Sequence, residues 1–149
     1  GPMRCPVLPG HGTPHVVTVA NPRSWHVLYV EDDRVAALLF EEALRPHADF
    51  EVRVAESAAE AIECVAGWRP DALIIDAHLP DGDARTLLPR LRACADVAPD
   101  APAVVLSADL AQAAPAHGDL EGFAAWWTKP VHPVELVLAL RQLLTGSRG

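Results

Sequence analysis

The sequence predicts an α/β fold in which a five-stranded parallel sheet is covered by helices on both faces. Three apolar runs, at 27–30 (VLYV), 72–75 (ALII) and 103–106 (AVVL), are short, continuous and partly β-branched, as strands buried on both faces should be. Weaker runs at 51–55 (EVRVA) and 124–128 (AAWWT) complete a set of five. Helical patterns separate the runs, and this regular alternation implies right-handed crossovers and a parallel sheet.

The helical segments carry their own start and stop signals. The first, 34–45, ends before Pro46, and the second opens on a Ser57/Glu60 capping-box pattern and stops at Gly67. The other three are 84–94, with Pro89 expected to bend it, 109–117, expected to be short or mobile, and a helix that starts at Pro133 and runs through Leu144.

Length, charge and cysteine content limit the function. The chain of 149 residues is about one domain by the usual prior of ~100 to 200 residues. Twelve basic residues oppose 20 acidic ones, and the net charge of −8 argues against direct nucleic-acid binding and favours protein partners. No apolar run approaches the ~18 residues that cross a bilayer, so no membrane contact is expected. Three cysteines without C-x-x-C spacing indicate neither a zinc site nor a disulfide framework, so a cytoplasmic location is expected.

The chain divides into three parts. Residues 1–24 are rich in proline and lack a sustained period, as a flexible tail or linker would. Its first two residues, Gly1 and Pro2, precede Met3 and have the form of a protease-cleavage remnant. The predicted domain covers 25–145, and a short C-terminal tail covers 146–149.

Polar residues stand at the points where the predicted strands end. They are Glu31, Asp32 and Asp33 after the first strand, Asp76 after the third, Ser107 after the fourth and Lys129 after the fifth. In a parallel sheet these ends meet at one edge, where ligands gather. Crowded carboxylates would take up protons unless a cation shared the site, and such hard oxygen ligands suit Mg²⁺. A hydroxyl and an ammonium can hold phosphoryl oxygens. Because no nucleotide-binding glycine motif occurs, the phosphoryl group must come from elsewhere.

These residues also have ordinary structural interpretations. Asp76 could cap the end of its strand, and the acids after the first strand could cap the following helix, a role assigned here to Asp33. Lys129 is the single lysine beside eleven arginines. The use of lysine at this one position indicates that Lys129 has a specific role that requires a compact ammonium, and argues against a solvated surface charge.

Four segments together resemble the receiver domain of bacterial two-component response regulators, the CheY-like family. The segments are VLYVEDD, LIIDAHLPDGD, VVLSAD and WWTKP, in this order. The resemblance covers about 25–145 and implies a flavodoxin-like, doubly wound (βα)5 fold with strand order 2-1-3-4-5. It implies a phosphoacceptor domain for signal transduction that assists its own phosphorylation and dephosphorylation and is not otherwise an enzyme.

The resemblance further implies which residues receive the phosphoryl group and hold the metal. Asp76 would be the phosphoacceptor, and the donor would be a phosphohistidine on a histidine kinase or a histidine phosphotransfer domain. The cofactor Mg²⁺ would bind the side chains of Asp32 and Asp76 and the backbone carbonyl of His78. Glu31 would act on the metal through water.

Two more residues would complete the catalytic set with Asp76. Lys129, joined to Pro130 by a cis bond, would pair with a phosphoryl oxygen. Ser107 would hydrogen-bond the phosphoryl group and move on activation, which would switch a surface read by a downstream effector protein.

Three positions depart from the family pattern. Trp126 stands where a smaller aromatic residue usually acts as a rotamer switch, so its coupling to Ser107 is an open question. His78 and Asp109 lie two residues beyond Asp76 and Ser107, where they could tune the hydrolysis of the phosphorylated state.

The sequence leaves alternatives open. The chain could be free-standing or a part of a hybrid histidine kinase. A receiver-fold module that binds proteins without phosphorylation is the alternative function. An aspartate-nucleophile phosphatase would need a second Asp where His78 stands. Because no DNA-binding segment follows Leu144, the output is expected to pass through another protein.

Overall fold

A computed structural model describes residues 24–108 and 122–148 and contains a five-stranded sheet. The strands follow the order β2-β1-β3-β6-β7, and every neighbouring pair is parallel. Their bounds are β1 Trp25–Val30, β2 Phe50–Ala55, β3 Ala72–Asp76, β6 Ala103–Ser107 and β7 Ala125–Thr128. This arrangement is the predicted 2-1-3-4-5 order, because β4 and β5 belong to a separate small hairpin.

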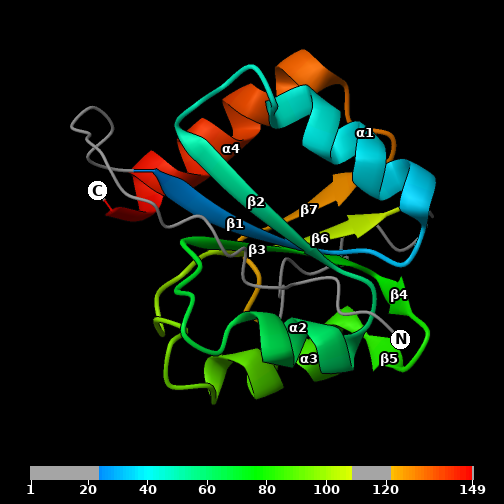
Figure 1. Cartoon of the computed structure of the whole chain (residues 1–149), viewed down its shortest axis with the longest axis vertical. Helices are drawn as coiled ribbons and strands as arrows, with labels where there is room; N and C mark the ends of the chain where they lie inside the picture. Colours follow the sequence, from blue (N-terminus) through cyan, green and yellow to red (C-terminus); the bar gives the residue numbers. More distant parts are fainter. Residues whose placement is uncertain (1–23, 109–121, 149) are drawn as a thin grey trace, which may run out of the picture.

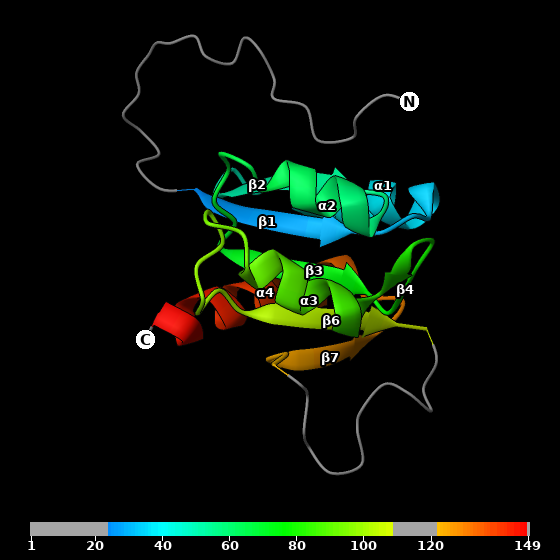
Figure 2. The ribbon, with the colours of Figure 1, turned by 90° about the horizontal axis from the view of Figure 1, so that it is seen from below.

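Helices cover both faces of the sheet, as predicted. One face carries α1 (Arg34–Leu44) and α4 (Pro133–Arg148), and the other carries α2 (Ala58–Cys64) and α3 (Ala84–Arg92) (Figures 1 and 2). Helix α4 begins at Pro133 as expected, but it continues beyond residue 145, into the segment expected to be a tail.

The core has two layers because successive residues of a strand point to opposite faces of the sheet. In β1, Leu28 and Val30 pack in the layer under α2 and α3, whereas Val27 and Tyr29 pack in the layer under α1 and α4. All five residues of β3 are buried, so this central strand contributes to both layers.

The helix starts agree in part with the predicted caps. The Asp33 carboxylate accepts from the backbone N–H groups of Val35 and Ala36, which confirms it as the cap of α1. The Ser57 hydroxyl accepts from Glu60 N, but the Glu60 carboxylate accepts from Glu56 N and not from Ser57 N, so the reciprocal capping box is wrong.

The loop after Asp76, which contains the sequence Pro-Asp-Gly, has regular structure of its own. It forms an antiparallel hairpin of β4 (His78–Leu79) and β5 (Gly82–Asp83). Between these strands, the Asp81 carboxylate accepts from Ala58 N at 2.8 Å and Ala59 N at 3.1 Å. Asp81 therefore caps α2 from a distant loop, and these hydrogen bonds lower the pKa of its carboxyl.

Some sequence predictions fall on residues that the structure does not describe. These are the helix at 109–117, Asp109 itself and all of the tail before residue 24. Cys94 is a free thiol, and Cys64 is 1% exposed. Within 24–108 and 122–148, no helix is both long and apolar enough to cross a membrane.

Candidate functional site

The predicted site residues meet at the carboxyl edge of the sheet. Asp76 and Ser107 are the last residues of β3 and β6, while Glu31 and Lys129 directly follow β1 and β7. Strand β1 pairs with β3, β3 with β6 and β6 with β7, and all three pairs are parallel. The four strands therefore end at the same edge of the sheet. Glu31 and Ser107 are each 1% exposed and Asp76 is 8% exposed, so these polar groups are buried.

Three carboxylates form a compact cluster of possible metal ligands. One oxygen from each of Glu31, Asp32 and Asp76 lies within 4.8 Å of the others. Asp32 is exposed, so the cluster opens to solvent on one side. Hard oxygen donors in this arrangement fit Mg²⁺, which takes one or two protein carboxylates and keeps several waters.

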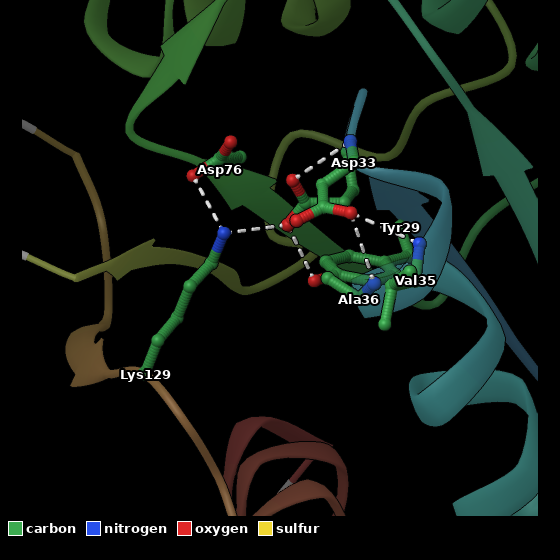
Figure 3. A network of polar contacts seen from close by, with 7 residues as sticks. Tyr29, Asp33, Val35, Ala36, Asp76 and Lys129 are labelled. Carbon is green, nitrogen blue, oxygen red and sulfur yellow. Dashed lines mark hydrogen bonds and ion pairs between the residues drawn. The ribbon is translucent and has the colours of Figure 1, made fainter.

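Lys129 bridges two of these carboxylates. Its Nζ lies 2.7 Å from Glu31 Oε1 and 3.2 Å from Asp76 Oδ1 (Figure 3). Burial lowers the pKa of Lys129, but the hydrogen bonds and charges of Glu31 and Asp76 together outweigh this effect and raise it. The backbone holds the residue in place, since Lys129 N donates to Ser107 O at 2.9 Å and the bond to Pro130 is cis, as expected.

The Asp76 carboxyl has an unusually high pKa. Burial and the nearby negative charge of Glu31 raise its pKa to about 6, although Lys129 acts in the opposite direction. At neutral pH the group is therefore mostly ionised, and it is more basic than an exposed aspartate. A buried, ionised carboxylate beside an ammonium can act as a nucleophile.

Tyr29 is part of the site, although the sequence had suggested no role for it. Its hydroxyl donates to Glu31 Oε1 at 2.7 Å, and Asp33 N donates to Glu31 Oε2 at 3.2 Å. Burial and the charge of Glu31 raise the pKa of Tyr29 strongly, so the phenol stays protonated and can donate. The only indication in the sequence is the hydroxyl group of Tyr29 within the otherwise aliphatic run VLYV.

The remaining predicted residues lie around this group. His78 opens β4 and is exposed, two residues after Asp76. Trp126 lies on β7 and packs against the layer under α2 and α3, with the Arg85 guanidinium 5.4 Å above its ring. Its indole Nε1 is buried and has no hydrogen-bond partner in the part of the chain that the structure describes.

Comparison with known proteins identifies the family and agrees with the fold. The sequence model of the response regulator receiver domain matches residues 27–141. The chain belongs to this family. A curated relative, response regulator MprA of Mycobacterium ulcerans, is 33% identical over 128 residues, which are 84% of this chain and 52% of the relative. The receiver chain thus spans about half the length of the curated relatives that it matches.

Solved receiver structures agree with this assignment. A response regulator from Chloroflexus aurantiacus is 33% identical with a TM-score of 0.70, over 83% of this chain and 99% of that chain. The receiver domain of the sensor histidine kinase PA1611 from Pseudomonas aeruginosa is 25% identical with a TM-score of 0.69, over 82% of this chain and 98% of that chain. That structure has a magnesium ion coordinated in its active site cleft.

Proposed function

We propose that this receiver domain accepts a phosphoryl group on Asp76 from a phosphohistidine of a histidine kinase or histidine phosphotransfer domain. One observation carries the proposal: the buried Asp76 carboxylate lies 3.2 Å from the only lysine in the chain, within a cluster of three carboxylates. A nucleophile, a fixed positive charge and a set of metal ligands are the groups that phosphoryl transfer requires.

The resemblance to the receiver family implies the ligand set for Mg²⁺, and the cluster of Glu31, Asp32 and Asp76 carboxylates supports it. Asp32 and Asp76 would bind through carboxylate oxygens, His78 through its backbone carbonyl, and Glu31 through water. When bound, the metal supplies positive charge that stabilises the phosphoryl oxygens during transfer. Glu31 suits an indirect role because both its oxygens already accept hydrogen bonds from protein groups.

The residues of the chain then carry out the transfer. A carboxylate oxygen of Asp76 attacks phosphorus and forms the P–O bond of an acyl phosphate, while the P–N bond to the histidine donor breaks and its electron pair stays on the imidazole. The Lys129 ammonium pairs with the negative charge on the phosphoryl oxygens. Ser107, whose side chain is buried at the same edge, would donate its hydroxyl proton to one of these oxygens.

Movement of Ser107 would carry the signal away from the site. A group that binds one of two conformations more tightly shifts the population toward it. Trp126 lies on the neighbouring strand β7, and its buried indole N–H has no hydrogen-bond partner among the described residues, which would favour a change of rotamer when Ser107 moves. A downstream effector protein would read the altered surface around β7 and α4.

Intact mass spectrometry tests the proposal directly. Incubation with Mg²⁺ and acetyl phosphate should add one phosphoryl group to the wild-type chain and none to Asp76→Asn, because the amide cannot form the acyl phosphate. Asp100→Asn, which changes an exposed carboxylate in a turn before β6, should be phosphorylated like wild type. Absence of any adduct on the wild type would instead support a module that binds proteins without phosphorylation.

His78 should set the lifetime of the phosphorylated state. Its side chain is exposed and stands two residues beyond Asp76, at a position where the family resemblance implies that side chains border the attacking water. We expect His78→Ala to change the rate of dephosphorylation several-fold, measured as loss of the phosphoryl mass after the donor is removed. His132→Ala, another exposed histidine that is not near Asp76 in sequence, is the control. Equal decay rates for wild type and His78→Ala would refute this role.

A further inference from the structure

Tyr29 makes a contact that links the core of the sheet to the phosphorylation site. Its ring is 2% exposed and stacks on Phe40 of α1, with the ring centroids 4.0 Å apart. Its hydroxyl donates to Glu31 Oε1 at 2.7 Å, and Lys129 Nζ donates to the same oxygen at 2.7 Å. One carboxylate oxygen therefore joins the phenol to the ammonium (Figure 3).

The Glu31 carboxylate is held at both of its oxygens. Glu31 Oε2 accepts from Asp33 N at 3.2 Å, while Oε1 accepts from Tyr29 and Lys129. Because Glu31 is 1% exposed, bulk solvent cannot readily replace a lost donor. Rotation of the carboxylate would break hydrogen bonds to a buried charge, so these donors fix its orientation.

We propose that Tyr29 is a positioning residue of this site: its hydroxyl holds Glu31, and Glu31 in turn holds the Lys129 ammonium beside Asp76. The consequence for phosphorylation rests on the proposed function of Asp76. Tyr29 touches neither the phosphoryl group nor the nucleophile, and it acts only through Glu31.

Loss of the Tyr29 hydroxyl should slow the maximal rate of phosphorylation more than it weakens the binding of the phosphodonor. In Tyr29→Phe the ring and its stacking on Phe40 remain, but Glu31 Oε1 keeps Lys129 as its only donor. Because one donor fewer then holds Glu31, its carboxylate is expected to turn and the paired ammonium to shift relative to Asp76, and small displacements of a catalytic group are costly. We expect phosphorylation at saturating acetyl phosphate to slow about tenfold, as for the loss of one hydrogen bond to a charged group. The acetyl phosphate concentration for half-maximal rate should change much less.

The composition of the chain permits a test without phosphorylation. Lys129 is the only lysine, so protein grown on ¹³C,¹⁵N-lysine gives one set of lysine side-chain NMR signals, which needs no assignment to a residue. We expect the wild-type Cε and Nζ signals to be shifted from those of free lysine, with slow exchange of the ammonium protons. In Tyr29→Phe the signals should move toward the free-lysine values, and proton exchange should accelerate.

A matched variant separates positioning from packing. Phe40→Leu removes the aromatic partner of Tyr29 but leaves its hydroxyl, so it should lower the thermal midpoint and keep the wild-type lysine signal. The proposal is overturned if Tyr29→Phe keeps the wild-type lysine signal, or if Phe40→Leu moves it equally. These spectra are recorded without metal and phosphodonor, so their result is independent of whether Asp76 is phosphorylated.

The rate measurement is interpreted separately. If the wild-type chain takes up no phosphoryl group while Tyr29→Phe moves the lysine signal, the proposed function fails and the positioning role stands. If the wild type is phosphorylated and Tyr29→Phe reacts at the same maximal rate, Tyr29 has no positioning role in the transfer.

Discussion

Lys129→Met should lower the free energy of unfolding by about 3 kcal/mol at neutral pH, because it removes the cation from a buried carboxylate. Glu31 is 1% exposed, and its Oε1 lies 2.7 Å from Lys129 Nζ. The same Nζ lies 3.2 Å from Asp76 Oδ1. Without the ammonium, the two acids repel each other in a poorly solvated place. Urea denaturation followed by tryptophan fluorescence measures the change.

The pH dependence of this loss has a definite sign. The pKa of Asp76 is already raised to about 6, and Lys129 opposes that rise. Removing Lys129 raises the pKa further above its unfolded value, so the destabilisation grows as the pH rises through that range and fades as the carboxyl takes up a proton. The loss in Lys129→Met should therefore be larger at pH 8 than at pH 5.

A double variant provides the control for Lys129→Met. Glu31→Gln together with Lys129→Met removes both charges of the pair, so it should recover much of the stability lost in Lys129→Met alone. A loss below about 1 kcal/mol in Lys129→Met would mean that the pair contributes no more than a surface ion pair.

Leu73→Ala should destabilise the domain by about 2–5 kcal/mol, because it leaves a cavity in the central strand. Leu73 is 0% exposed and lies on β3, three residues before Asp76, in the layer packed under α2 and α3. The same substitution at Leu39, which is 64% exposed on α1, should change stability by about 0.5 kcal/mol or less. Chemical denaturation of the two variants under identical conditions makes the comparison.

These two leucine variants test whether the buried packing of β3, the strand that ends at Asp76, stabilises the domain. Equal losses in Leu73→Ala and Leu39→Ala would show that burial does not distinguish the two positions. A large loss only in Leu73→Ala would agree with a strand whose apolar residues fix where the Asp76 carboxylate stands.

The parallel sheet and the composition of the site could be predicted because they depend on local patterns and on strand direction, whereas the strand order was implied by the resemblance to the receiver family. The runs at 27–30, 72–75 and 103–106 are apolar along their length, which is typical of strands covered on both faces. Parallel strands end at the same edge, so Asp76 and Lys129 could be expected to meet although they are far apart in sequence.

Other features of the site could not be predicted because they depend on distances between distant side chains. Asp81 caps α2 from a loop 23 residues away, and no local motif indicates such a contact. The Glu60 carboxylate accepts from Glu56 N, where the capping-box pattern predicted Ser57 N, and the local sequence does not distinguish these two neighbouring donors.

The sequence by itself determined a parallel α/β receiver domain with Asp76, Lys129 and the paired acids at one edge. Only the tertiary structure decided which of these charged groups pair with one another. Glu31 binds Lys129 across 98 residues of sequence and receives a second hydrogen bond from Tyr29, which the pattern of β1 had indicated only as a core residue. The physical reason is that periodicity specifies which face a residue takes, whereas a hydrogen bond needs the atomic separation and burial that packing alone provides.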